Sequence, residues 1–392
     1  MPRVAIRRVL FAAAATALAA ACASGGAVAS AATAATAAAD AVTAAPAIST
    51  GFTGFTAFGA LAGVSASSAS NAWAVGATTK GAKYTGPLTV HWNGKGWTKV
   101  PSPGPATATL TAVDALSASN AWAVGNTTLS QGSQPFIIHW NGKTWARAAA
   151  PRVAGAFVYM NSVSATSSGN VWVVGLSVKG ALILHWNGKA WTQLAAPKYA
   201  ELLSVSAVSG SDAWAVGALV SAAGPSRDLI LHWNGKAWSV VSGPHAEADA
   251  ALSGVAATSA GNAWTIGCPC AGGPQGVVTA RWNGKSWANV PVPVPSAFGD
   301  SGEIAAVGGV AWASGQYCKA RCTGDSAVIA PLLMRWTGKK WQVTANPLPQ
   351  QADVGVEGLA VTSATNAWAV GTIEEAPNNK TFILHWNGKT WS

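Results

Sequence analysis

Histidine titrates near neutral pH and binds metals, so the 6 histidines of this sequence are the first candidates for chemistry. Five of them share one position, directly before a Trp-Asn-Gly-Lys string: His91, His139, His185, His232 and His385. Arg281 and Arg335 occupy the matching position in two further copies, and only His245 lies outside the pattern. A catalytic or metal-binding histidine is needed once or in a converging cluster. Repetition at one position therefore favours a structural role.

Four cysteines form the second candidate set. Cys268 and Cys270 are separated by one residue, and Cys318 and Cys322 by three. In an exported protein an even number of cysteines first indicates disulfides, within one loop or between two loops. The spacing matches the usual zinc-binding pairs poorly, although a four-thiolate zinc site and free or redox-active thiols are alternatives. We predict disulfides and no metal.

Paired carboxylates are the third kind of candidate, because a glycosidase needs two of them roughly 5 to 10 Å apart. The chain has 14 acidic residues. Those in its variable segments are scattered: Asp228, Glu247, Asp249, Asp300, Asp325, Glu374 and Glu375. No phosphate-binding glycine loop or nucleophilic serine motif occurs in a suitable context. We predict no catalytic residues and no cofactor, and we keep a carbohydrate-active enzyme (glycosidase, lyase or oxidase-like) that uses these carboxylates as the alternative.

One heptapeptide, HWNGKTW at 139–145, recurs with little change seven times between Trp92 and Trp391. Its Asn-Gly dipeptide favours a two-residue type I′ hairpin turn. That register places Trp140 opposite Lys143 and Ile138 opposite Trp145. It also places Ile138, Trp140 and Trp145 on one face of the hairpin, with His139 on the other.

The tryptophans follow the same repeat, and seven copies of three account for all 21 of them. The first of each repeat has a glycine three residues later: Trp73, Trp122, Trp172, Trp214, Trp264, Trp312 and Trp368. The hairpin pairs are Trp92/Trp97, Trp140/Trp145, Trp186/Trp191, Trp233/Trp238, Trp282/Trp287, Trp336/Trp341 and Trp386/Trp391. Left exposed at on the order of 200 Å² each, they would far exceed the apolar surface that a soluble monomer tolerates. We therefore assign them to the core of the repeats.

Each repeat contains four short strand patterns, which we call A to D. In the second repeat they lie at 110–115, 120–125, 136–140 and from Lys143 onward. A Ser-x-x-Asn or Ser-x-x-Asp turn joins A to B in six repeats, whereas the sixth has Val307 and Val310 instead. A period near 48 residues with four strands predicts an all-β fold, a seven-bladed β-propeller of four-stranded antiparallel blades. We expect no helix.

Three strings of the fourth repeat, at 202–205, 212–217 and 231–238, carry a family resemblance. They resemble the repeat of Asp-box propellers, especially the photosystem-assembly-factor type, whose hairpin reads roughly Asp-Gly-Gly-Lys-Thr-Trp. The pattern is also similar to kelch and galactose-oxidase-like propellers, and its Trp-rich, Ala-rich form resembles secreted actinobacterial proteins. The resemblance spans about residues 58–392 and implies the propeller fold. It implies no single activity, because propellers host unrelated functions, and the Asp-box Ser and Asp are missing here.

The first residues have the pattern of a secretory signal, with Arg3, Arg7 and Arg8 before an apolar run. We expect residues 1–29 to be removed, or a shorter lipoprotein signal to leave Cys22 as the lipidated first residue. Without the three arginines the formal charge falls from +10 to +7. The protein is therefore expected to be secreted or held at the extracellular surface by a lipid.

The remaining chain divides into an Ala/Thr-rich linker at 30–57 and the propeller at 58–392. The repeats span about 58–105, 106–154, 155–199, 200–247, 248–297, 298–350 and 351–392. The seventh repeat stops one residue after Trp391, which leaves almost no strand D. We expect residues 48–55 to pair with this blade as its outer strand.

In such a blade the B-to-C loops and D-to-A connections share one face, and the A-to-B and C-to-D turns share the other. The turns are near-copies, whereas the B-to-C loops vary in length and composition. Variable loops on a rigid scaffold usually carry binding. The predicted binding residues on this loop face are Tyr317, Lys319, Arg321, Asp325, Arg227, Asp228, Glu374 and Glu375.

These observations predict an exported, monomeric, non-catalytic binding or scaffold module at the cell surface. Its expected partner is an extracellular or cell-wall polysaccharide or a protein. The seven hairpin lysines could attract anionic polymers, but solvated turn lysines are ordinary and no nucleic-acid motif accompanies them, so no nucleic acid is expected. Membrane contact is expected only through the N-terminal lipid. A purely structural surface protein is a second alternative.

Overall fold

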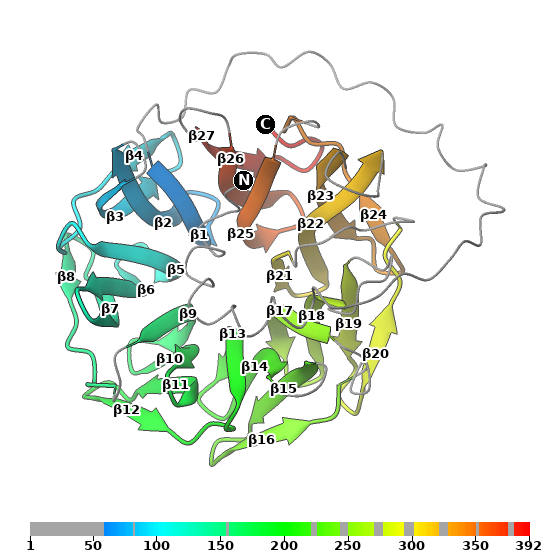
Figure 1. Ribbon diagram of the computed structural model, residues 1–392. Helices are drawn as coiled ribbons and strands as arrows, with labels where there is room; N and C mark the ends of the chain where they lie inside the picture. The colour runs from blue at the N-terminus through cyan, green and yellow to red at the C-terminus, as the bar shows by residue number, and fades with distance from the viewer. Residues whose placement is uncertain are drawn as a thin grey trace.

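The computed structural model describes residues 59–80, 83–153, 157–220, 226–243, 250–269, 277–293, 302–320, 328–349, 353–374 and 380–392. Within these ranges the chain forms strands β1 to β27 and no helix, so none that could cross a membrane. Seven antiparallel sheets are arranged in a ring around a central axis (Figure 1). The predicted seven-bladed propeller is confirmed, with six four-stranded blades and a last sheet of three strands.

Each blade runs from an inner strand A to an outer strand D. The A strands are β1 (Gly59–Ser68), β5 (Ala108–Ser117), β9 (Val158–Ser167), β13 (Ala200–Ser209), β17 (Ala250–Ser259), β21 (Ile304–Val307) and β25 (Asp353–Ser363). The B strands are β2 (Asn71–Lys80), β6 (Asn120–Leu129), β10 (Asn170–Ser177), β14 (Asp212–Leu219), β18 (Asn262–Pro269), β22 (Val310–Ala320) and β26 (Asn366–Glu374).

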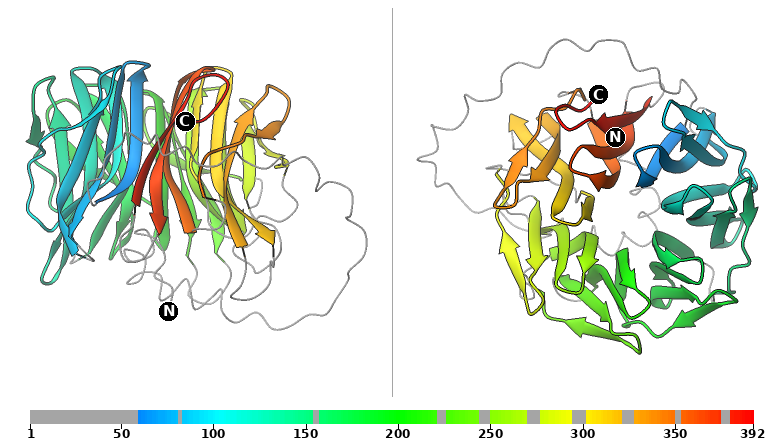
Figure 2. Two further views of the ribbon diagram at one scale, coloured as in Figure 1. Left: turned by 90° about the horizontal axis from the view of Figure 1, so that it is seen from above. Right: turned by 180° about the vertical axis from the view of Figure 1, so that it is seen from behind.

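The C strands are β3 (Lys83–Trp92), β7 (Gly132–Trp140), β11 (Gly180–Trp186), β15 (Arg227–Trp233), β19 (Val278–Trp282), β23 (Val328–Trp336) and β27 (Lys380–Trp386). The D strands are β4 (Trp97–Lys99), β8 (Trp145–Arg147), β12 (Trp191–Leu194), β16 (Trp238–Val241), β20 (Trp287–Val290) and β24 (Trp341–Val343). In blade 7 a single bridge between Trp386 and Trp391 takes the place of strand D. Seen from the side, the strands of all blades run roughly along the ring axis, so their turns gather at two opposite faces (Figure 2).

A bulge in strand A explains the glycine three residues after the first tryptophan. The register of the A–B pair shifts at the same place in every blade except the sixth, as between Met160 and Ser162 in blade 3. The shift brings the strand A carbonyls close to strand B. A Cβ on Gly175 would lie only 1.9 Å from the carbonyl oxygen of Tyr159. Only glycine fits at this position.

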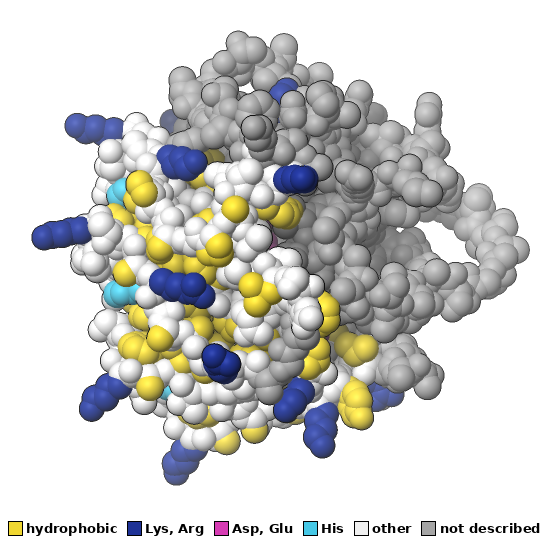
Figure 3. Space-filling view, turned by 60° about the vertical axis from the view of Figure 1, so that its left-hand side comes forward, with side chains coloured by type: hydrophobic (Ala, Val, Ile, Leu, Met, Phe, Trp, Pro, Cys, Tyr) yellow, Lys and Arg dark blue, Asp and Glu magenta, His cyan; other side chains and the backbone are white. Residues whose placement is uncertain are grey.

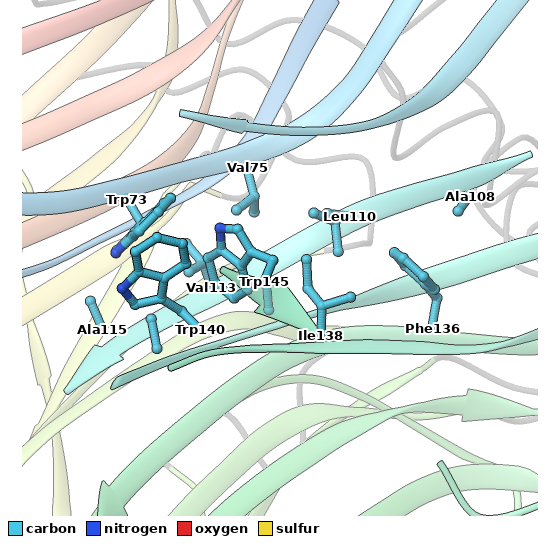
Figure 4. Close-up of a cluster of buried hydrophobic side chains, with 12 residues drawn as sticks. Trp73, Val75, Ala108, Leu110, Val113, Ala115, Phe136, Ile138, Trp140 and Trp145 are labelled. Carbon is cyan, nitrogen blue, oxygen red and sulfur yellow. The ribbon is translucent and has the colours of Figure 1, made fainter. Parts of the chain in front are cut away.

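Tryptophans from neighbouring blades pack together to hold the ring. In Figure 4 the ring of Trp73 from blade 1 lies against Trp140 and Trp145 of blade 2, with centroid distances of 4.8 and 4.9 Å. The same contact occurs at all seven blade boundaries. At the last one, Trp368 of blade 7 packs against Trp92 of blade 1 at 5.0 Å, which closes the ring. The prediction that the tryptophans form the core is supported by these contacts.

The hairpin register differs from the predicted one. Trp140 pairs with Trp145, not Lys143, and strand D begins at Trp145. The loop has four residues, and only its Gly142 has positive φ, so the turn is not type I′. The Asn141 side chain accepts the backbone N–H groups of Lys143 and Thr144, each at 2.9 Å, and this capping selects the longer loop.

The face assignment survives the change of register, because Ile138, Trp140 and Trp145 still share one buried cluster. Several predictions fall outside the described residues. They are the signal segment, lipidation of Cys22, the linker, and the pairing of residues 48–55 with blade 7.

Candidate functional site

The repeated histidines lie beneath the turns and are part of the blade. His139 Nε2 lies 2.9 Å from the Asn120 Oδ1 of the A-to-B turn, and its ring lies 4.3 Å from the ring of Trp122. The same pairing holds in blades 1, 3 and 7, while His232 meets Asp212 at 2.8 Å. Burial lowers the pKa of the histidines that pair with asparagine, which favours their neutral form: His91, His139, His185 and His385.

Blades 5 and 6 carry arginine in the histidine position. Arg281 keeps the polar pairing, because its Nε donates to Asn262 Oδ1 at 2.8 Å, and its guanidinium lies 5.0 Å from the centre of the Trp264 ring. In blade 6, Val310 occupies the turn position that Asn262 holds in blade 5, so Arg335 lacks this partner. Its buried Nε finds no hydrogen-bond partner in the described part of the chain.

A groove lies at the boundary between blades 5 and 6, near the turn face. It is open to solvent and has a volume of about 420 Å³. Its lining includes Gly261, Arg281, Trp282, Ala288 and Val290 of blade 5 and Trp336 of blade 6. Two indoles and a guanidinium therefore border one cavity.

The exposed charge of the described surface has one sign. All lysine and arginine side chains described there are exposed except the half-buried Arg281 and Arg335. The six acidic side chains described are all buried or half-buried: Asp114, Glu201, Asp212, Asp228, Glu303 and Glu357. In Figure 3 basic side chains project around the visible face, with almost no acidic surface between them. The lysine at each of the seven hairpin tips is exposed.

Asp114 is an acid that sequence analysis did not single out. It lies on β5, where the matching residues of blades 1, 3 and 4 are serines. Its carboxylate accepts the backbone N–H of Ala165 in blade 3 at 2.7 Å and the hydroxyl of Ser65 in blade 1 at 3.2 Å. Burial raises its pKa, although these hydrogen bonds work in the opposite direction. The departure from serine was the signal in the sequence.

The predicted loop-face residues are distributed over three blades. Arg227 is exposed at the start of β15, and the adjacent Asp228 is 8% exposed, with its carboxylate beside Gly243. Tyr317 is half-buried and packs against the hydrophobic cluster between blades 5 and 6. Lys319 lies in β22 and Glu374 ends β26. Arg321, Asp325 and Glu375 lie outside the described residues.

The four cysteines are only partly placed. Cys268 is half-buried in β18, and Cys318 lies in β22, the B strand of the next blade. Cys270 and Cys322 lie outside the described residues, so the disulfides stay a prediction. Among the side chains described, no three His, Cys, Asp or Glu form a group that could hold a metal ion.

No protein-family model matches the chain, and no curated protein matches its sequence. Solved structures share its fold. YCF48 from Cyanidioschyzon merolae matches with a TM-score of 0.52 at 13% identity, over 84% of this chain and 97% of that one. Virginiamycin B lyase from Staphylococcus aureus matches at 0.55 and 12%, over 83% and 94%.

A third solved structure is a polysaccharide lyase of the ulvan lyase type bound to a GlcA- and sulfated-rhamnose-containing fragment. It matches with a TM-score of 0.55 at 9% identity, over 86% of this chain and 96% of that one. The TM-scores show a shared propeller fold, and at these low identities they show the fold alone. Among the neighbours are both enzymes and non-enzymes, so the fold by itself leaves the activity open.

Proposed function

We propose that this protein is an exported, non-catalytic binding module at the cell surface that recognises polysaccharide or protein through its variable loop face. The observation that carries the proposal is that the repeated histidines and tryptophans are already engaged in contacts within the fold. The histidine Nε2 atoms bond to turn residues, and the tryptophans pack between blades. These groups build the scaffold, and the loops that differ between blades are left to provide recognition.

The exposed basic surface adds a preference among ligands. Because every exposed charge on the described side chains is positive, an acidic polymer would be attracted more strongly than a neutral one. At the groove between blades 5 and 6, the half-buried Trp282 leaves part of its indole open to contact a sugar ring. Polysaccharide is therefore the first partner to test, and protein the second.

A carbohydrate-active enzyme is the second candidate. Its candidates are the acidic residues of the variable segments, among them Glu374 at the end of β26, because a pair of carboxylates can act as acid and base in such an enzyme. The polysaccharide lyase that shares the fold shows that a propeller can support such chemistry. A purely structural surface role would require neither ligand binding nor turnover.

A glycan array followed by analysis of the bound sugar tests these alternatives. We expect the mature protein to bind an acidic glycan and to release it unchanged after prolonged incubation. Shortened or oxidised sugar would overturn the non-catalytic proposal if its formation stops in Asp325→Asn or Glu374→Gln. Failure to bind any glycan or any surface protein in a broad screen would favour the structural role.

A further inference from the structure

We infer that the groove between blades 5 and 6 is a subsite for a carboxylate-bearing sugar unit, so that the protein takes acidic polysaccharide there. The inference rests on the proposed function for its class of ligand, polysaccharide, and goes beyond it in the place of binding. It places one point of recognition near the turn face, away from the variable loops. The expected ligand is a polysaccharide chain that contains uronate units.

Arg281 supplies the group that would recognise the carboxylate. Of its five N–H donors, only Nε is used by the described residues, in the bond to Asn262 Oδ1. That bond and the face of Trp264 hold the guanidinium in place. The four terminal N–H groups remain available, and a planar guanidinium matches a carboxylate with two parallel hydrogen bonds. A fixed cation of this kind loses little side-chain entropy when a ligand binds.

The groove walls favour a sugar. Trp282 of blade 5 is half-buried, and the exposed part of its indole is suited to the C–H face of a pyranose ring. Trp336 of blade 6 also lines the cavity but is only 9% exposed, because it packs on Trp264. Gly261 lines the groove without a side chain, and the space that a side chain would enter is free, since a Cβ there would meet no atom within 4 Å. Three other blades have serine at the matching turn position: Ser70, Ser119 and Ser211. Blade 6 also combines glycine with arginine, in Gly309 and Arg335, but only blade 5 adds an asparagine, Asn262, that holds the guanidinium.

Neighbouring charges favour a polymer over a single sugar acid. The hairpins on either side of the groove end in the exposed Lys285 and Lys339, and no acidic side chain described on the surface opposes them. A chain with regularly spaced carboxylates could contact these lysines while one unit occupies the groove. Such long-range attraction weakens with salt, whereas the partly buried arginine contact is screened less.

Two substitutions remove the subsite without disturbing the blade. Arg281→His restores the pairing that blades 1, 2, 3 and 7 make between histidine and asparagine, so this variant should fold. Gly261→Leu places a side chain in open space beside the groove and should block it. Lys99→Ala removes the same charge from an exposed position on β4 of blade 1 and serves as the control.

Calorimetric titration with trigalacturonate, its methyl ester and poly-glutamate tests the subsite. We expect the wild-type protein to bind trigalacturonate, and the ester, Arg281→His and Gly261→Leu each to weaken binding about ten- to one-hundredfold, as for a lost charged hydrogen bond. Lys99→Ala should stay within about twofold, the scatter of an exposed charge.

Three results would overturn the subsite: unchanged affinity in Arg281→His, equal affinity for the ester, or tighter binding of poly-glutamate, which would indicate an acidic protein partner. Retained binding of array glycans by Arg281→His would overturn the subsite alone. If the wild-type protein bound no glycan and no protein, both the subsite and the proposed function would be overturned.

Discussion

The inner strands make different contacts at two blade boundaries, the one between blades 3 and 4 and the one between blades 5 and 6. At the first, Asn161 donates to the carbonyl of Leu202 at 2.8 Å, and Ser164 accepts the N–H of Ala207 at 3.0 Å. At the second, the bulge residue Ser253 makes the bond that matches Asn161, to the carbonyl of Gly302 at 2.8 Å, but Ala256 stands where Ser164 stands in blade 3, so that second bond is missing. Strand β21 also has only four residues and no bulge.

The difference between these boundaries indicates where a ligand groove can form in a repeated fold. At the bulge of blade 3, two consecutive side chains, Asn161 and Ser162, bond the backbone of blade 4. At the bulge of blade 5 only Ser253 bonds the backbone of the next blade, because the residue after it is Gly254. Such bonds tie the inner strands together. The groove occurs at the boundary where the inner strand is shortest and where arginine replaces histidine. Departure from the repeat thus coincides with the space for a ligand.

The glycine after the first tryptophan should distinguish the two kinds of blade most strongly. Gly175→Ala in blade 3 drives a Cβ against a carbonyl oxygen, and we expect it to lower the free energy of unfolding by about 3 to 5 kcal/mol. Gly315→Ala in blade 6 meets chiefly a methyl of Val277, at 2.7 Å, and should cost about 1 to 2 kcal/mol. Urea unfolding measures both, and equal losses would contradict the comparison.

Acid should weaken the histidine-bearing blades. The pKa values of His91, His139, His185 and His385 are lowered by burial, so the unfolded chain binds protons more readily. Above the unfolded-state pKa of about 6.5, these histidines are neutral in both states and do not change the stability with pH. Below that pH the unfolded chain takes up protons first, so the free energy of unfolding falls.

The matched variant for this test is His185→Arg, which copies the arginine–asparagine pair of blade 5 and removes one titrating group. Its unfolding free energy, measured by urea titration between pH 7.5 and 5, should fall less steeply than that of the wild type. Burial raises the pKa of Asp114, so this group stabilises the fold as pH falls. Because both proteins retain Asp114, parallel slopes would count against the histidines.

Removing one inner-strand bond should have a smaller effect. Ser164→Ala copies the residue that blade 5 has at this position and leaves the N–H of Ala207 without its acceptor. We expect a loss of about 1 kcal/mol in thermal or urea unfolding. Ser239→Ala, at an exposed hydroxyl on β16, should change stability by less than about 0.5 kcal/mol. A similar change in both variants would mean that the inner bonds add nothing.

The hairpin lysines should have the smallest effect on stability. Lys189 is exposed, so Lys189→Ala should shift the unfolding free energy by less than about 0.5 kcal/mol. Asn187→Ala removes the cap from two backbone N–H groups and should cost about 1 kcal/mol. Thermal unfolding of the pair compares them. A larger loss for the lysine would show that it helps to build the blade.

Repetition made the blades predictable, because a residue that recurs seven times at one position reports a shared environment. The turn register was not predictable in this way. Asn-Gly generally favours a two-residue turn, but the hydrogen bonds that Asn141 accepts from the backbone favour the four-residue loop. The bulge left no fixed residue type to recognise: its extra position is Thr111 in blade 2 and Asn161 in blade 3.

The groove was visible only in part. Arg281 stood out as a departure from histidine, but Trp336 belongs to the next repeat and was indistinguishable from the other hairpin tryptophans. Only the packing of blade 6 on blade 5 brings the two side chains to one cavity. Sites between repeats depend on how units stack, which the pattern inside one unit does not encode.

The seam between blades 7 and 1 has a consequence for how the chain folds. Thr381 donates to the carbonyl of Gly59 across a separation of 322 residues, and Trp368 packs on Trp92. Blades 1 to 6 can form one after another from contacts between neighbouring repeats. The seam can form only after both of its blades exist, so its high contact order makes ring closure the expected last and slowest step of folding.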